Sequence, residues 1–357
     1  MCVLVALVAA ACSGSDPDTI DWYVSSDNFG ARALAESCGG VDVRVHELPR
    51  DADEAHSELV RRLAADPESV DLLTVAGSAV PELAAAGFLR KQSADVATGA
   101  LPAAADQVTY DGDLYAVPWL FDPQLLWFRP ITAERAGIDV TQPVAWTDLI
   151  DGAARLGLTV QIADDRNTGL ADWVSAMGAD EFAAEIVELY RDGGVGPGPS
   201  ASAVDAFAGP KGGFLIAPAS AWSDPAMAPL GTEIGVAPYP VVDADSVGPA
   251  EGIVLAQTQG SSANALIDCL TSDATLAPLV AVSGFAPART DVPMAETPAA
   301  KVLETVLPTV ATAPITESWN AIRRALHHTW VMDEVSIDQT PAASRRAVEA
   351  AKKGRLP

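Results

Sequence analysis

The chain has 357 residues, of which 49% are hydrophobic, and its 48 acidic and 22 basic residues give a formal net charge of -26 at pH 7. This length exceeds that of one ordinary hydrophobic core, so we expect two packed lobes. The net negative charge repels phosphate backbones and anionic lipid headgroups, which argues against nucleic acid as a partner.

The N-terminus carries an apolar run over residues 3–11 that ends at Cys12. The run is too short to span a bilayer and is typical of a secretory signal peptide, although a buried N-terminal strand is the alternative. The sequence resembles a bacterial lipoprotein signal, which implies a signal peptide at 1–11, an acylated Cys12 and a linker at 12–18. It departs from that pattern because no Lys or Arg precedes the run and because Ala9 stands where a larger aliphatic residue is commoner.

Short β-rich runs and amphipathic helical runs alternate through the first quarter of the chain. Strands are expected at 19–25, 41–48 and 70–77, and helices at 29–40, 54–67 and 80–89. Repeated strand and helix units of this length predict a parallel sheet covered on both faces.

The rest of the chain has a similar mixture of elements. Helices are expected at 133–139, 146–157, 171–194, 261–272, 315–335 and 342–354, and strands at 213–222 and 234–242. The Gly/Pro-rich stretch at 193–200 follows a helix rather than a strand, so it predicts a surface loop and not a dinucleotide-binding turn.

Signatures of catalysis are missing from the sequence. There is no Gly-x-Ser-x-Gly elbow, no phosphate-binding Gly-Lys-Ser/Thr loop and no Ser-x-x-Lys. Neighbouring carboxylates such as Asp164 and Asp165 are expected among 48 acidic residues, and we interpret them as a solvated loop. No Cys-x-x-Cys or His-Glu-x-x-His spacing occurs. The sequence therefore predicts no enzyme, no metal site and no cofactor.

A ribbon at 110–128, YDGDLYAVPWLFDPQLLWF, combines aromatic rings with carboxylate and amide groups. A sugar offers C–H faces and a rim of hydroxyls, so its site needs flat aromatic faces with carboxylates or amides beside them. Trp127 and Phe128 are expected in the core. The candidate ligand contacts in the ribbon are Trp119, Phe121, Asp122 and Gln124.

The start of this ribbon, YDGDLYAVP, resembles the segment that crosses between the lobes in family 1 extracellular solute-binding proteins of ABC importers. Further segments resemble that family in the same order along the chain, at 125–139, 143–156, 214–222, 234–242 and 282–292. Because the segments keep the family order from Ile20 to about Arg289, the chain is identified as similar to this family.

The resemblance implies an α/β fold of the type II periplasmic-binding-protein class, with a ligand cleft between two lobes. It implies lobe 1 at 19–119 and 246–289, and lobe 2 at 120–245 and 290–357. The expected protein is an extracytoplasmic monomer that captures a carbohydrate by hinge closure and delivers it to ABC permease subunits in the membrane, to which a lipid would anchor it.

The same resemblance implies further ligand contacts outside the ribbon. Trp222 and Trp319 fit core packing equally well, and Trp22 is expected in the core. The added candidates are Asp27, Asn28, Trp222, Tyr239, Glu251 and Trp319.

Four shorter pieces, at 36–40, 264–270, 312–322 and 352–357, resemble the trehalose-binding lipoproteins of actinobacteria. These pieces include Cys38 and Cys269, for which we expect one disulfide in an oxidising compartment, with two buried thiols as the alternative.

The resemblance to these lipoproteins weakens where their ligand binds. Ala76, Gly77 and Ser78 stand where they have an acidic residue, and Ala313 stands where they have arginine. The ligand is therefore predicted as a di- or oligosaccharide that could be trehalose-like. The alternatives are a peptide, a polyamine or an organic acid and, in another class, a secreted hydrolase.

Overall fold

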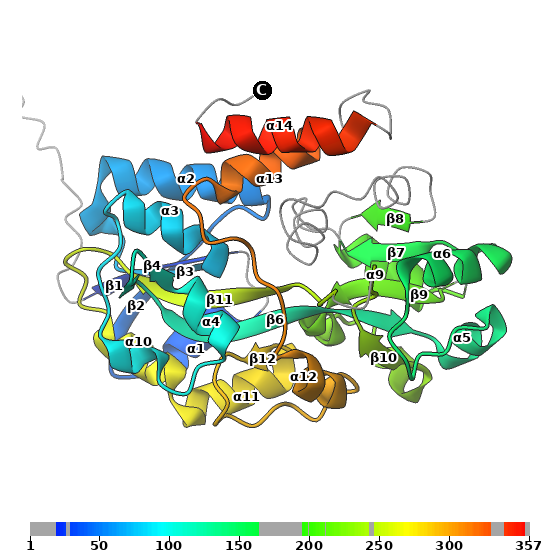
Figure 1. Ribbon diagram of the computed structural model, residues 1–357. Helices are drawn as coiled ribbons and strands as arrows, with labels where there is room; N and C mark the ends of the chain where they lie inside the picture. The colour runs from blue at the N-terminus through cyan, green and yellow to red at the C-terminus, as the bar shows by residue number, and fades with distance from the viewer. Residues whose placement is uncertain are drawn as a thin grey trace, which may run out of the picture.

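The computed structural model describes residues 19–25, 29–163, 195–198, 200–210, 212–242, 246–329 and 339–353 (Figure 1). The predicted signal peptide, the linker with Cys12, and the predicted helix at 171–194 lie outside the described residues, as do Asp27 and Asn28.

Parallel strands form the start of lobe 1, as the alternating pattern predicts. Strand β1 (Thr19–Val24) lies between β2 (Asp42–Glu47) and β3 (Leu72–Ala76) and pairs in parallel with both. Residues of β1 and β3 are almost wholly buried, which agrees with their apolar sequences. Trp22 is fully buried and donates its indole N–H to Thr74 Oγ1 at 2.8 Å, so its expected place in the core is confirmed.

Helices cover this part of the sheet. Helix α2 (Ala52–Ala65) begins at Asp51, whose carboxylate accepts the backbone N–H groups of Asp53 and Glu54 and so caps the first turn. The other elements up to residue 107 are α1 (Ala31–Ser37), η1 (Pro67–Ser69), η2 (Gly77–Ala79), α3 (Val80–Ala85), η3 (Ala94–Ala97) and α4 (Pro102–Gln107).

The predicted ribbon starts as a hairpin and continues as a long strand. Strands β4 (Thr109–Tyr110) and β5 (Asp113–Leu114) are joined by Asp111 and Gly112, both with positive φ, as a tight hairpin turn requires. Strand β6 (Val117–Phe128) has twelve residues, and ten of them are buried.

Strand β6 connects the two lobes because it pairs with different strands along its length (Figure 1). Its first half pairs with β11 (Ala250–Gln257) and β12 (Ala286–Pro287). Its second half pairs with β9 (Phe214–Pro218) and β10 (Gly235–Pro238). Among the described residues the main strand order is β2-β1-β3-β11-β6-β9-β7-β8, in one sheet that runs through both lobes.

Lobe 2 is built on the second half of β6. Strand β7 (Val160–Ala163) pairs in parallel with β9 and with β8 (Val195–Gly198). The prediction of a loop at 193–200 is therefore wrong for 195–198, because β8 lies at the sheet edge, where a strand can contain proline. The other elements are α5 (Pro130–Ala136), α6 (Trp146–Arg155), α9 (Ser200–Ala208), η5 (Ala219–Ser223) and η6 (Ala228–Glu233).

The returning segment of lobe 1 contains α10 (Asn264–Thr271) and α11 (Asp273–Ser283). A disulfide joins Cys38, at the end of α1, to Cys269 in α10, with a Cα–Cα distance of 5.8 Å. Within the described ranges no single helix is long and apolar enough to cross a membrane, and α10 with α11, bent by 58°, passes that test only as a pair.

The last helices are α12 (Ala300–Val306), α13 (Trp319–His327) and α14 (Thr340–Lys352). Helix α14 packs along α13, and Figure 1 shows both at the top of the view. Buried side chains of α13 belong to the same apolar cluster as lobe 2 residues such as Leu126 and Tyr239. Helix α13 is therefore anchored in lobe 2 while it faces lobe 1.

Candidate functional site

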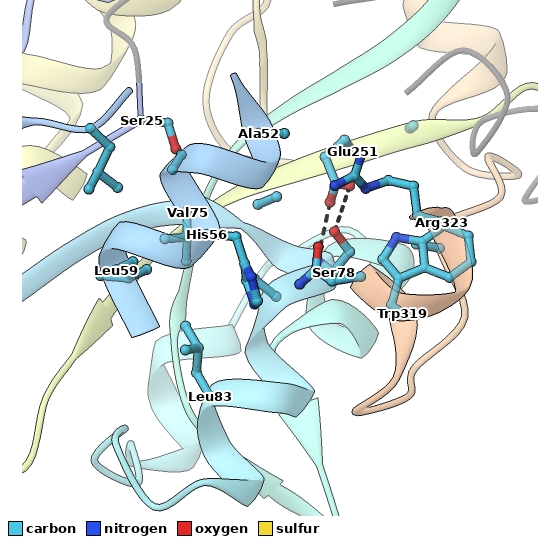
Figure 2. Close-up of a pocket in the computed structure, with 17 residues that line it drawn as sticks. Ser25, Ala52, His56, Leu59, Val75, Ser78, Leu83, Glu251, Trp319 and Arg323 are labelled. Carbon is cyan, nitrogen blue, oxygen red and sulfur yellow. Dashed lines mark hydrogen bonds between the residues drawn. The ribbon is translucent and has the colours of Figure 1, made fainter. Parts of the chain in front are cut away.

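A cavity of about 180 Å³ lies between lobe 1 and α13 (Figure 2). Lobe 1 contributes Leu48 just after β2, the end of β3, the inner face of α2, η2 and Leu83 of α3, while β11 forms one end. The polar and aromatic lining residues are Ser25, His56, Ser78, Glu251, Trp319, Asn320 and Arg323.

Glu251 is the half-buried acid of this cavity, and Ser78 and Gln107 fix its position. Ser78 donates its backbone N–H to Oε1 at 3.3 Å and its hydroxyl to Oε2 at 2.9 Å (Figure 2). The Gln107 amide donates to Oε1 at 3.1 Å. Burial raises the pKa of Glu251, and the hydrogen bonds from Ser78 and Gln107 oppose that rise. A partly desolvated carboxylate is a strong acceptor for sugar hydroxyls.

Two glycines make room for Gln107. Its Oε1 accepts the backbone N–H of Gly252 at 2.8 Å, directly beside Glu251. A Cβ at Gly77 would lie 2.8 Å from Gln107 Oε1, and a Cβ at Gly252 would be closer still. A larger residue at either position would displace the amide that orients Glu251.

Contacts between α13 and lobe 1 close the other side of the cavity. Asn320 donates its amide to Glu82 Oε2 at 2.8 Å, and His56 Nε2 lies 2.9 Å from each Glu82 carboxylate oxygen. Burial alone would raise the pKa of Glu82, but the hydrogen bonds from His56 and Asn320 outweigh it and hold that pKa below its usual value. Arg323 pairs with Asp53 at the start of α2.

Arg323 and Trp319 complete the wall on the α13 side. Arg323 is buried, and in Figure 2 its side chain extends in the direction of Glu251. Trp319 starts α13, retains 4% exposure and lines the cavity. An aromatic ring, a carboxylate, an amide and a guanidinium around one cavity can bind a neutral polyol by stacking and hydrogen bonding. Among the described residues no group of three or more His, Cys, Asp or Glu side chains could hold a metal ion.

Residues 31–305 match the family model described as bacterial extracellular solute-binding protein. The chain belongs to this family. Membership implies an extracytoplasmic location and a role in binding a solute.

Solved structures similar to this solute-binding protein have the same two-lobed fold. The GacH receptor of Streptomyces glaucescens GLA.O, solved unliganded and with acarbose, has a TM-score of 0.78 at 20% identity, with 94% of this chain and 98% of that chain covered. An ABC transporter solute-binding protein from Thermotoga lettingae TMO, bound with α-D-tagatose, has a TM-score of 0.76 at 18% identity, covering 94% and 99%. Maltose-bound MalE3 of T. maritima has a TM-score of 0.72 at 18% identity, with the same coverage.

Of the residues predicted to contact ligand, Glu251 and Trp319 line the cavity. Trp119, also predicted to contact ligand, does not line this cavity. Its side chain is fully buried in the lobe 1 core, where the ring packs edge-on against Phe29 and the indole N–H donates to the Leu270 carbonyl at 3.1 Å. Trp119 therefore supports the fold, as do Trp127 and Phe128, whose expected core positions are confirmed.

Asp122 lies opposite Glu251 across the β6–β11 pair, but it is not part of this cavity. Ser220, in η5 of lobe 2, donates its backbone N–H to Oδ1 at 3.0 Å and its hydroxyl to Oδ2 at 2.6 Å. Burial raises the pKa of Asp122 to about 7, although the bonds from Ser220 oppose this shift. The structure thus gives Asp122 a partner in lobe 2 rather than a place at the cavity.

The remaining described candidates also lie away from this cavity. Phe121 is fully buried, Trp222 stacks on Trp127 with ring centroids 6.5 Å apart, and Tyr239 packs edge-on against Trp146. Gln124 donates its backbone N–H to the Pro249 carbonyl near the crossing of the lobes.

Sequence reasoning missed His56, Asn320 and Arg323. They come from the inner faces of α2 and α13, which are far apart in the chain and carry no local motif. Ser78 could be noticed only as a departure from the acidic residue of similar lipoproteins. Asn320 and Arg323 are three residues apart, which places them on one face of α13. This spacing is the feature of the sequence that could have indicated their shared position.

Proposed function

We propose that this solute-binding protein is the carbohydrate-binding component of an ABC importer. The observation that supports this most directly is Glu251, a half-buried carboxylate held by Ser78 and Gln107 at the end of a cavity that Trp319 also lines. The proteins of similar fold that were solved with acarbose, tagatose and maltose agree with a neutral, hydroxyl-rich ligand.

The proposed mechanism is hinge closure about β6 and β11. Ligand contacts from Glu251 in the crossing strands and from Trp319 in α13 would favour the closed arrangement. The Asn320–Glu82 and Arg323–Asp53 contacts add to the stability of that arrangement because they join α13 to lobe 1. The closed protein would then present its ligand to the permease subunits, and this chain would perform no catalysis.

The finer proposal is a lipoprotein that binds a di- or oligosaccharide of the trehalose type. It is supported by the resemblance of the four short segments, which include both disulfide cysteines. A Cys12→Ser protein should leave the membrane fraction, since acyl chains at Cys12 would supply the anchor. Unchanged membrane association of that variant would contradict the lipoprotein proposal.

Calorimetry with the wild-type protein tests the carbohydrate proposal. A panel of neutral mono-, di- and oligosaccharides should include at least one that binds with a weak dependence on salt, since no counterions are displaced. Tight, salt-sensitive binding of a peptide, polyamine or organic acid, with no binding of any sugar, would favour a non-sugar solute instead. Turnover of any bound sugar would contradict the binding-protein function.

A further inference from the structure

The two ends of the cavity differ in chemistry. Figure 2 shows Leu59, Val75 and Leu83 on one side and Ser78, Glu251, Trp319 and Arg323 on the other, with His56 between them. Leu48, Ala52, Ala55 and Ala79 also line the cavity, and Ser25 is the polar residue on the side of Leu59 and Val75.

Three elements of lobe 1 build the aliphatic end. Ala52, Ala55 and Leu59 are spaced by three and four residues and so form one stripe of α2. Val75 comes from β3 and Leu83 from α3. Leu59, Val75 and Leu83 retain only 4%, 5% and 2% exposure, so this wall belongs to the lobe 1 core and is already in place for a ligand.

Aliphatic side chains offer no hydrogen bond to a sugar hydroxyl. A hydroxylated ring placed against this wall would lose its bonds to water without replacement, which is unfavourable. A CH₂ or CH₃ group in the same place would instead gain from leaving water. The cavity of about 180 Å³ is more than ten times the roughly 10–15 Å³ that one water requires by this measure, so it has space for several carbon atoms.

We propose that the ligand is a carbohydrate bearing an apolar substituent, such as an alkyl aglycone or a deoxygenated alkyl segment. The sugar ring would lie at the Glu251 and Trp319 end, and the substituent would lie against Leu59, Val75 and Leu83. This inference rests on the proposed carbohydrate function and adds the substrate class to it.

The test compares methyl and n-hexyl glycosides of glucose, galactose and mannose, in both anomers, by calorimetry below the micelle concentration of the hexyl compounds. Burial of one methylene is worth about 0.8 kcal/mol, which corresponds to about fourfold in affinity. If two or three methylenes enter the aliphatic end, a hexyl glycoside should bind about 15- to 60-fold tighter than its methyl counterpart.

Val75→Thr links this preference to the aliphatic end. The substitution replaces one methyl group with a hydroxyl and nearly keeps the shape of the side chain, so it should lower the hexyl-to-methyl affinity ratio several-fold while the methyl glycoside binds as before. Val60→Thr is the matched control, because Val60 is on α2 but does not line the cavity. Its affinity ratio should equal that of the wild-type protein, and the melting temperature of each variant checks folding.

The outcomes separate this inference from the proposed function. Equal binding of methyl and hexyl glycosides would overturn the apolar-substituent inference and leave the carbohydrate function standing. A hexyl preference that Val75→Thr does not reduce would also overturn it, since the chain would then lie elsewhere. Absence of binding across all the glycosides, with a charged solute bound instead, would overturn both.

Discussion

Strands β6 and β11 run side by side through the centre of the molecule, yet they present their polar side chains to different surroundings. Glu251 on β11 and Asp122 on β6 are direct partners in the ladder. A serine holds each carboxylate by its backbone N–H and its hydroxyl, and each serine lies in a 3-10 turn directly after a strand. Ser78 belongs to lobe 1 and Ser220 to lobe 2.

The two carboxylates differ in their surroundings. Glu251 borders the cavity beside Trp319, whereas Asp122 is turned toward Ser220 in lobe 2 and does not line that cavity. We therefore propose two roles for similar local chemistry: β11 contributes to ligand binding, and β6 ties the crossing of the lobes to each core. Substitutions on both strands can test this division of roles.

The largest expected effect is that of Trp119→Ala on stability. Removing a fully buried tryptophan should lower the free energy of unfolding by about 3–5 kcal/mol, because a cavity and an unpaired Leu270 carbonyl remain. Denaturant titration measures this loss, and Trp119→Phe should recover part of it by filling the cavity again. A Trp119→Ala protein with wild-type stability and no sugar binding would assign β6 to the ligand site.

Glu251→Gln should weaken ligand binding while the fold remains. Hydrogen bonds to a charged acceptor are worth about 1.5–3 kcal/mol and those to a neutral one about 0.5–1.5 kcal/mol, so each bond from the sugar should lose roughly tenfold in affinity. Glu304→Gln, the same change at an exposed position of α12, is the control and should bind as the wild-type protein does. If Asp122→Asn lost more affinity than Glu251→Gln, the assigned roles would be reversed.

Asp122→Asn should change how stability depends on pH. The pKa of Asp122 is raised from 3.8 to about 7 in the folded protein, so between these values the folded state keeps a proton that the unfolded state has lost. This group therefore makes stability fall as pH rises from about 4 to about 7, by at most about 1.4 kcal/mol per pH unit. The amide of the variant cannot titrate, so melting temperatures measured across this range should fall less steeply than in the wild-type protein. Identical slopes would contradict a raised pKa at Asp122.

The smallest expected effect is that of Asn320→Ala on closure. A typical hydrogen bond contributes about 0.5–1.5 kcal/mol, so losing the bond to Glu82 should weaken affinity by roughly two- to tenfold. Stopped-flow fluorescence should show faster ligand dissociation, because the closed arrangement is less stable. Unchanged dissociation would mean that the contact between α13 and lobe 1 does not assist closure.

Local patterns in the sequence are sufficient to predict much of lobe 1. Buried β-rich runs such as Leu72–Ala76 and the apolar stripe of Ala52–Ala65 identify their own elements, and the structure has them close to the expected positions. The ribbon is harder to interpret because ten of the twelve residues of Val117–Phe128 are buried. Because both faces of the strand are covered, its sequence does not alternate between apolar and polar residues. The pattern therefore cannot tell a ring that faces a ligand, as expected for Trp119, from a ring that packs in the core.

The candidate site could be predicted only in part. Glu251 and Trp319 were found through the family resemblance, whereas His56, Asn320 and Arg323 become neighbours only when α13 packs against lobe 1. That packing depends on contacts such as Asn320–Glu82, which join positions 238 residues apart and leave no local signal. The core position of Trp119 also left no local signal, because its partner, the Leu270 carbonyl, is distant in the sequence.

A crystal structure of the protein with a bound sugar from the calorimetric panel tests the central claim most directly. We expect sugar hydroxyls within hydrogen-bonding distance of Glu251, the ring packed against Trp319, and the Asp122 carboxylate still bound to Ser220. Sugar density in contact with Asp122 and Trp222, with the cavity at Glu251 and Trp319 free of ligand, would contradict it.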